Sequence, residues 1–151
     1  MKIKDQSIGI VPIFKDSAGE NLFLVVLHKA GHWAFPKGHK KAGENDSDTA
    51  TRELYEESGI RYVKLENHKE FLEYYSFEKN GKKYDKKVKY FIGFVKDTNI
   101  DQPEEFKKEI PETRFVNYEE ALELMTYDES KNLLKKVRDY LENLKIKKLE
   151  I

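Results

Sequence analysis

Four glutamates and one arginine lie at fixed spacings between two glycines in residues 38–60. If the second half of this segment is helical, at about 100° per residue, Glu53, Glu56 and Glu57 share one arc about 100° wide. Like charges three or four residues apart on a helix repel by about 0.2–0.5 kcal/mol per pair. Glu56 and Glu57 also precede Gly59, a natural helix terminator, where the helix dipole disfavours anions. The arrangement opposes folding unless a cation compensates, and a hard divalent ion with oxygen ligands is the expected one.

The carboxylates need a helix to bring them together, and the sequence predicts one over residues 47–58, capped by Asp46 or Ser47. A second helix is expected over residues 117–125, because its first residue is an asparagine that can cap it. Leucines and a valine at helical spacing predict a final amphipathic helix over residues 129–147.

Runs of aliphatic, aromatic and β-branched residues between turn residues predict the strands. Pro36 keeps the short segment before it extended. Asn80 and Gly81 form the strongest short hairpin signal, and they join the two longest runs. Strands interleaved with three helices favour an α/β fold, an α/β/α sandwich with a mixed β-sheet, in a single domain over residues 1–151. The expected strands are residues 8–14, 21–27, 33–36, 62–77, 86–95 and 114–116.

The composition is typical of one globular domain. Of the 151 residues, 38% are hydrophobic, which is enough to build a core. The 28 basic residues balance the 28 acidic ones, so no overall field attracts nucleic acid or a membrane surface. The absence of cysteine excludes disulfides and thiolate metal sites. No apolar run approaches a membrane span and the polar N-terminus does not resemble a signal peptide, so we expect a cytoplasmic protein.

The spacing of the chemical residues resembles a known family signature. The segment matches the Nudix box at every defined position. It consists of Gly38, five residues, Glu44, seven residues, and then Arg-Glu-Leu-Tyr-Glu-Glu-Ser-Gly-Ile over residues 52–60. In the Nudix family this box forms a loop–helix–loop that holds Mg²⁺ or Mn²⁺ against a diphosphate linkage. The resemblance therefore implies the Nudix fold and a metal-dependent pyrophosphohydrolase.

The resemblance also implies a role for each residue of the box. A divalent ion can neutralise the phosphate charge and acidify the attacking water, and Mg²⁺ takes few carboxylates beside its waters. One glutamate that is not fully committed to metal could act as general base, and Glu53 or Glu57 is the candidate. The implied catalytic residues are Glu53, Glu57 and Arg52, the latter as an orienting salt-bridge residue. The implied metal ligands are Glu53, Glu56, Glu57 and the Gly38 carbonyl, while Glu44 shapes the loop and Gly59 terminates the helix.

Segments outside the box resemble the asymmetrical diadenosine tetraphosphate hydrolases of this family. The similarity includes His-Trp-Ala-Phe-Pro-Lys-Gly-His at residues 32–39 and shorter stretches at residues 87–91 and 114–121, and it covers most of residues 7–125. Ala42 departs from the pattern, because these enzymes often have a proline there. The implied reaction cleaves diadenosine tetraphosphate into ATP and AMP.

Enzymes of this subfamily bind polyphosphate with lysines and stack adenine between aromatic rings. The resemblance therefore implies several substrate-binding residues in this chain. The same pattern places a further metal-binding carboxylate at Glu109, with Glu112 as the alternative. Each of these candidates also has a non-functional interpretation. Lysines on a hairpin can be solvated, tyrosines on strands often pack in the core, and Glu109 or Glu112 can be an ordinary surface residue. The candidate substrate-binding residues are His32, Lys37, Tyr74, Tyr75, Lys86, Lys87 and Tyr90.

Three other functions share parts of this pattern. An RNA 5′-pyrophosphohydrolase, with 5′-capped RNA as a further substrate, or an enzyme that sanitises nucleoside triphosphates would use the same metal chemistry. The neutral net charge gives little support for regular RNA binding. A non-catalytic nucleotide sensor would usually lack a box glutamate, whereas Glu53, Glu56 and Glu57 are all present.

Overall fold

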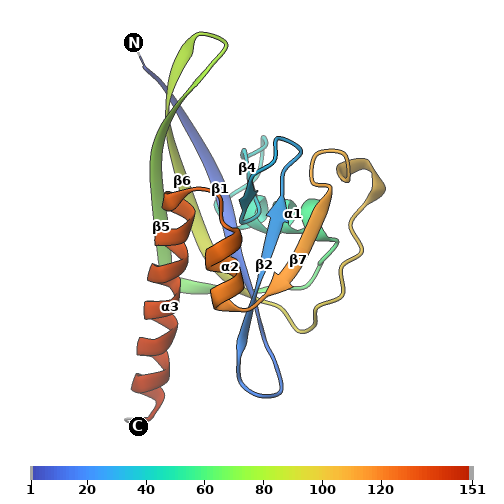
Figure 1. Ribbon diagram of the computed structural model, residues 1–151, viewed down its shortest axis with the longest axis vertical. Coiled ribbons are helices and arrows are strands. Elements are labelled where there is room, and N and C mark those ends of the chain that lie inside the picture. Colours follow the sequence, from blue (N-terminus) through green and yellow to red (C-terminus); the bar gives the residue numbers. More distant parts are fainter. Residues whose placement is uncertain (1, 150–151) are drawn as a thin grey trace.

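A computed structural model describes residues 2–149, apart from the side chains of residues 67, 68 and 149. One mixed sheet dominates the fold, with helices on both of its faces (Figure 1). The order along the sheet is β3-β2-β1-β6-β5, while β4 pairs with β1 and β7 pairs with β2. The strands are β1 (Lys2–Lys15), β2 (Asn21–Leu27), β3 (Trp33–Ala34), β4 (Lys37–Gly38), β5 (Lys64–Lys79), β6 (Lys82–Phe94) and β7 (Glu112–Val116).

The centre of the sheet is β1, which runs parallel to β6 from the pair Lys2–Lys83 to the pair Ile13–Phe94. It is antiparallel to β2 and to the short β4. Residues 7–13 of β1 are all buried, because both faces of this strand are covered. A strand that is buried on both faces has a continuous apolar sequence, and residues 8–14 show this pattern.

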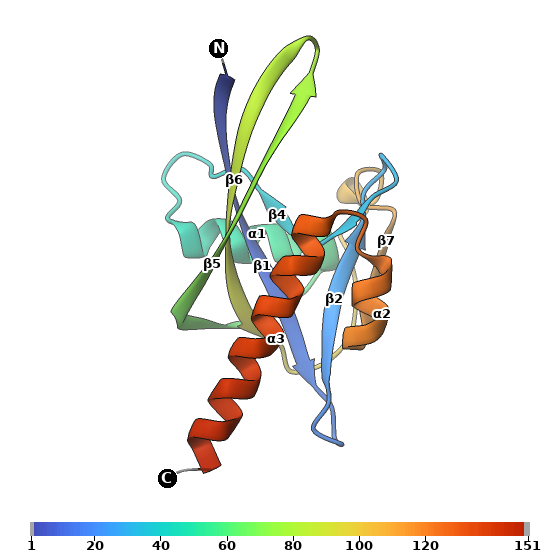
Figure 2. The same ribbon diagram turned by 60° about the vertical axis from the view of Figure 1, so that its left-hand side comes forward.

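The helices form two layers, which confirms the expected α/β/α sandwich (Figure 2). On one face α1 (Asp46–Ser58) buries Ala50 and Leu54 against Ile8 and Ile10 of β1. On the other face lie α2 (Tyr118–Leu124) and α3 (Asp128–Leu149), which cover a core that includes Val11 and Ile13 of the same strand. Among the described residues, no helix is both long and apolar enough to cross a membrane.

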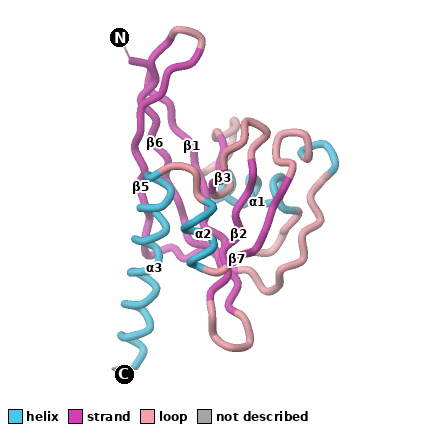
Figure 3. Tube along the Cα trace, viewed as in Figure 1, coloured by secondary structure: helices cyan, strands magenta, loops and turns pink. Residues whose placement is uncertain are grey.

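Several element boundaries differ from the sequence prediction. The first strand begins at Lys2, and β6 begins at Lys82, so polar residues extend the sheet into a long arm (Figure 3). Pairing along β1 and β5 supplies the hydrogen bonds that hold these polar residues in strands. Asn80 and Gly81 turn the hairpin with φ of 53° and 73°, as Asn-Gly predicts. A short 3₁₀ helix, Glu104–Phe106, was not predicted.

The cap of α1 also differs from the prediction. Asn45, and not Asp46 or Ser47, is the N-cap: its side chain accepts a hydrogen bond from the Asp48 N–H, and the Asp48 carboxylate accepts one from the Asn45 N–H. This reciprocal pair is a capping box. For α2 the predicted asparagine, Asn117, is the cap and accepts a hydrogen bond from the Glu120 N–H.

Candidate active site

The orientation of α1 fixes where the acidic side chains lie. Because Leu54 faces the sheet, the helix turns Glu53 and Glu57 towards β4. The helix ends at Gly59, which has φ of 82° and donates its N–H to the Tyr55 carbonyl. A Cβ atom at this glycine would lie 1.9 Å from the Asp101 carbonyl oxygen, so both backbone conformation and space require glycine here.

Arg52 holds three carboxylates and the loop before the helix. Its Nε donates to Glu44 at 2.5 Å and its Nη2 donates to the other oxygen of Glu44 at 3.0 Å. Its Nη1 donates to Glu53 at 2.9 Å and to Glu56 at 3.1–3.2 Å, and Nη2 also reaches the His39 carbonyl at 2.9 Å. A planar guanidinium can satisfy this many acceptors at once, which a lysine could not.

Glu44 ties the loop between β4 and α1 to the helix. Hydrogen bonds from Arg52, then from the Lys41 N–H, lower the pKa of Glu44 to about 2. The Thr49 hydroxyl also donates to this carboxylate at 3.0 Å. The carboxylate is therefore fully engaged in shaping the loop, and it stays ionised at any physiological pH.

Glu57 is buried and incompletely satisfied. Only 4% of the residue is exposed, and its Oε2 accepts the Lys37 main-chain N–H at 3.1 Å. Its Oε1 has no hydrogen-bond partner among the described residues. Burial, and then the charge of Glu53, raise the pKa of Glu57 well above its usual value. Burial, and then Glu56, raise the pKa of Glu53 as well. The carboxylates thus lie together with too little positive charge around them.

A divalent cation fits this donor set. Hard cations take carboxylate oxygens, and Oε1 of Glu57 is such an oxygen: it is buried beside the Glu53 carboxyl group, and no donor among the described residues satisfies it. Glu53 lies against β4 so closely that a Cβ atom on Gly38 would stand 1.9 Å from its Oε1. No group of three or more acidic or histidine side chains within the described chain is already arranged around one metal position. Arg52 instead holds Glu53 and Glu56 in this conformation.

A cavity of about 360 Å³ adjoins the carboxylates. The link between the two is Lys37, because its main chain contacts Glu57 while the residue also lines the cavity. Burial, then the charge of Lys86, lower the pKa of Lys37. Its ammonium forms no ion pair within residues 2–149 as far as the side chains are described, although the charges of Glu73, Glu57 and Asp5 act on it. The lining residues are His32, Ala34, Lys37, Glu73, Tyr75, Ser76, Phe77, Tyr127, Glu129 and Ser130.

Aromatic rings form one wall of this region. The His28 and His32 rings stack with centroids 4.3 Å apart and 12° between their planes, and the Tyr127 ring lies 5.5 Å from that of His32. Burial, then His32 and Lys37, lower the pKa of His28 to about 4, and burial lowers that of His32. The His28 imidazole is therefore neutral at pH 7, and the His32 imidazole binds a proton less readily than a free one. Rings of this kind can stack on a flat heterocycle.

The predicted substrate residues divide into two groups. His32, Lys37 and Tyr75 line the cavity. Lys86 lies behind it, only 6% exposed, where it donates to Asp5 at 2.8 Å and to the Ser7 hydroxyl at 2.5 Å. It contributes charge near Lys37.

The remaining predicted residues lie outside the cavity. Tyr90 is 1% exposed and packs edge-on against Phe35, which leaves no ring face for a base. Tyr74 is 63% exposed and neighbours Lys87 across the hairpin, and neither residue lines the cavity. Glu109 is exposed and binds Lys29 at 2.7 Å, without a contact to the box glutamates. Its alternative, Glu112, pairs with Arg114. A metal role for Glu109 stays a prediction.

Three residues that the sequence interpretation missed contribute to the site: His28, Glu73 and Tyr127. His28 lies just after β2 and Tyr127 lies just before α3, so neither belongs to a recognisable motif. For Glu73 a signal existed. It is a carboxylate in the row Phe71-x-Glu73-x-Tyr75-x-Phe77, where strand alternation calls for an apolar residue.

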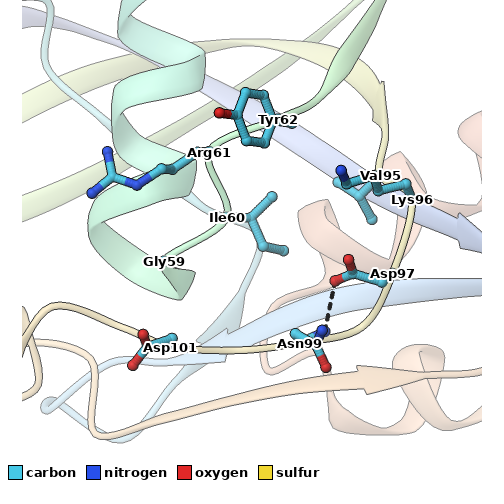
Figure 4. Close-up of a pocket in the computed structure, with 9 residues that line it drawn as sticks. All are labelled: Gly59, Ile60, Arg61, Tyr62, Val95, Lys96, Asp97, Asn99 and Asp101. Atoms are coloured by element: carbon cyan, nitrogen blue, oxygen red, sulfur yellow. Dashed lines mark hydrogen bonds between the residues drawn. The ribbon is translucent and has the colours of Figure 1, made fainter.

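A second hollow, of about 220 Å³, lies at the C-terminal end of α1 (Figure 4). Gly59, Ile60 and Tyr62 line one side of it, and Asp97 and Asp101 line another. None of the predicted catalytic or substrate-binding residues lines it; Gly59, which does, was predicted only to terminate the helix. The carboxylates and the 360 Å³ cavity are therefore the candidate reaction site.

Comparison with known proteins agrees with this choice. The model of the NUDIX domain matches residues 4–137. The bis(5′-nucleosyl)-tetraphosphatase [asymmetrical] of Mus musculus is 33% identical over 135 residues, which cover 87% of each chain. The protein of the same description from Caenorhabditis elegans is 30% identical over 138 residues, 90% of this chain and 96% of the relative. Among solved structures, a binary complex of C. elegans Ap4A hydrolase superposes with a TM-score of 0.77 and 26% identity, covering 92% of this chain and 98% of the other.

Proposed function

The chain belongs to the Nudix hydrolase family, and we propose that it cleaves diadenosine tetraphosphate asymmetrically into ATP and AMP. The names of the similar proteins support this substrate, and the similarity extends over most of the chain. The observation that carries the proposal is the position of Lys37. Its main chain contacts the buried Glu57, while the residue lines a cavity walled by aromatic rings.

We propose Glu53, Glu56, Glu57 and the Gly38 carbonyl as the residues that hold Mg²⁺ or Mn²⁺. The unpartnered Oε1 of Glu57 and the raised pKa values of Glu53 and Glu57 support this assignment. When bound, a divalent ion supplies charge neutralisation at the phosphates and acidifies the attacking water.

The protein's own residues perform the remaining tasks. Glu53 or Glu57 accepts the proton of the attacking water, as the carboxylate that is not fully committed to the metal. Arg52 orients Glu53 and Glu56 through its Nη1. Lys37 attracts a phosphate, because its ammonium is partly desolvated and has no ion-pair partner among the described residues.

The aromatic wall suits the adenosine part of the substrate. His32, Tyr75 and Tyr127 line the cavity on the side of the nucleoside in this proposal. Their rings provide flat apolar surface for a purine. A cavity of about 360 Å³ has the size of a small-molecule site and can hold one nucleoside with its first phosphate.

The test is a substrate panel with Mg²⁺ or Mn²⁺. It contains diadenosine tetraphosphate, nucleoside triphosphates, sugar nucleotides and RNA with a 5′-triphosphate, and the products are separated by ion-exchange chromatography. We expect the highest kcat/KM for diadenosine tetraphosphate, with ATP and AMP in equal amounts. Two molecules of ADP, or faster turnover of another group, would reject the proposed substrate and leave the family membership intact.

The metal assignment has its own test. Glu57→Gln should lower kcat by about a hundredfold, the scale of losing a metal ligand or a general base. Glu123→Gln, on the exposed side of α2, is the matched control and should leave kcat unchanged. A Glu57→Gln enzyme with near wild-type kcat would remove Glu57 from the proposed chemistry.

A further inference from the structure

Glu73 is a carboxylate in an apolar row. Along β5 the side chains of Phe71, Glu73, Tyr75 and Phe77 alternate with those of the opposite face. Phe71 packs edge-on against Tyr140 of α3, and the Tyr75 and Phe77 rings lie 6.1 Å apart. Glu73 is only 8% exposed between them, and it lines the 360 Å³ cavity.

No group of the described chain satisfies this carboxylate. Its Oε2 is buried without a hydrogen-bond partner. Two charged groups from other elements affect it: Lys37 of β4 attracts the negative charge, and Glu129 of α3 repels it. Burial is the largest cause that raises the pKa of Glu73 to about 7; the charge of Lys37 opposes this rise and the charge of Glu129 adds to it. A buried acceptor without a donor lowers the stability of a protein, so leucine would suit this position better for packing alone.

The cavity is lined by charges of both signs. Lys37, whose main chain contacts the box residue Glu57, lines it together with the carboxylates Glu73 and Glu129. A phosphate beside two carboxylates would be repelled, so the group that reaches Glu73 must be uncharged or carry hydrogen-bond donors. The aromatic rings recognise flat shape and give little directional selection. A polar acceptor in an apolar pocket is the kind of group that fixes the orientation of a ligand.

We propose that Glu73 is a specificity-determining residue, which accepts a hydrogen bond from an N–H of the purine or an O–H of the ribose. This inference rests on the proposed function, because it takes the cavity as the nucleoside site. It goes beyond that function in assigning the polar contact that selects the nucleoside. Lys37 then contacts a phosphate of the ligand, and Glu73 contacts a donor on its nucleoside.

Stability and binding should respond to Glu73→Leu in opposite directions. Loss of the unsatisfied acceptor should raise the Tm of the free protein by about 2–4 °C. The same substitution should weaken ATP binding about tenfold, because one buried hydrogen bond to the ligand is lost. Glu78→Leu, at an exposed position of the same strand, is the matched control and should change neither quantity. A fall in Tm with unchanged ATP affinity would show a structural role and overturn the proposal.

The donor is identified with three ligands, measured by calorimetry on the whole chain without metal. These are ATP, purine riboside 5′-triphosphate, which lacks the amino group, and 2′,3′-dideoxy-ATP, which lacks the ribose hydroxyls. The wild-type protein should bind one of the two analogues about tenfold more weakly than ATP, and Glu73→Leu should remove that difference. If each analogue binds more weakly than ATP by the same factor in the wild type and in Glu73→Leu, the assignment is overturned.

Two features keep the test decisive. If Glu73→Leu does not fold, Glu73→Gln takes its place and retains a weaker acceptor oxygen. A reduced preference for ATP over the weaker analogue then supports the acceptor role, and an unchanged preference contradicts it. Loss of folding in both variants would indicate a structural residue and reject the proposal. Because the binding titration does not require hydrolysis, failure to cleave diadenosine tetraphosphate would refute the proposed reaction without deciding the role of Glu73.

Discussion

Gly38→Ala probes the position of Glu53 without altering its chemistry. In the structure an added Cβ would lie 1.9 Å from Glu53 Oε1 and 2.2 Å from its carboxyl carbon. Real Cβ contacts essentially never fall below 3.0 Å, so the carboxylate must move by more than 1 Å, the difference between 1.9 and 3.0 Å. Gly38 has no positive φ, so alanine is compatible with its backbone.

The expected consequence is selective loss of activity. A displacement of about 1 Å in a reacting constellation can cost about a hundredfold in rate, so kcat should fall by that factor. The clashing atoms are the end of a flexible side chain, so the fold should persist, with a Tm within about 4 °C of the wild type. Steady-state hydrolysis of diadenosine tetraphosphate and differential scanning calorimetry measure the two quantities.

A second substitution makes the reasoning refutable. Glu53→Asp shortens the side chain by one methylene group and relieves the clash with the methyl group that Gly38→Ala adds. The double variant Gly38→Ala/Glu53→Asp should therefore be no slower than Glu53→Asp alone, a non-additive result. Near wild-type kcat in Gly38→Ala would show that the contact between Gly38 and Glu53 does not control the reaction. The same conclusion would follow if the kcat losses of Gly38→Ala and Glu53→Asp simply multiply in the double variant.

Three further predictions follow from the same contacts. Arg52→Lys should lower the free energy of unfolding by about 2–4 kcal/mol, because an ammonium cannot replace the planar guanidinium that donates to Glu44 and Glu53. Urea denaturation measures this quantity, and an unchanged value would contradict a stabilising role for these hydrogen bonds. Adding 5–10 mM Mg²⁺ should raise the Tm of the wild type by about 2–4 °C but not that of Glu57→Gln, whereas equal shifts would exclude Glu57 as a ligand. Glu73 has a folded pKa of about 7 above its unfolded value of 4.5, so its stabilising contribution is present below pH 4.5 and is lost as the pH rises towards 7. Wild type should therefore lose roughly 3 kcal/mol of unfolding free energy relative to Glu73→Gln between pH 4.5 and 7.5, and parallel curves would contradict the raised pKa.

The order of strands and helices was readable from local sequence patterns. Residues 8–14 form a continuous apolar run because they cross the buried centre of the sheet. Asn117 caps α2, and Asn80 with Gly81 turns the long hairpin, as those residue types predict. The polar ends of β1 and β6 were missed, because pairing with distant strands and not local composition keeps them extended.

The three candidate tyrosines show what local sequence patterns do not predict. Tyr74, Tyr75 and Tyr90 looked equivalent in the sequence. The register of β5 places Tyr75 on the side of α3 and the cavity, while Tyr74 remains exposed. Tyr90 lies on a strand that neighbours β1, where its ring is enclosed in the core. Strand parity is known from the sequence, but the face that receives a helix depends on the packing of the whole sheet.

The sequence by itself determined the family, the helix that carries the glutamates, and the glycine that ends it. All of these depend on residues within one short segment, where spacing along the chain fixes position in space. Only the tertiary structure decided that Lys37 joins Glu57 to a cavity, that Lys86 pairs with Asp5, and that Glu73 Oε2 is buried with no donor from the described residues. These features arise where segments distant in sequence pack together, and burial and missing partners are properties of that packing.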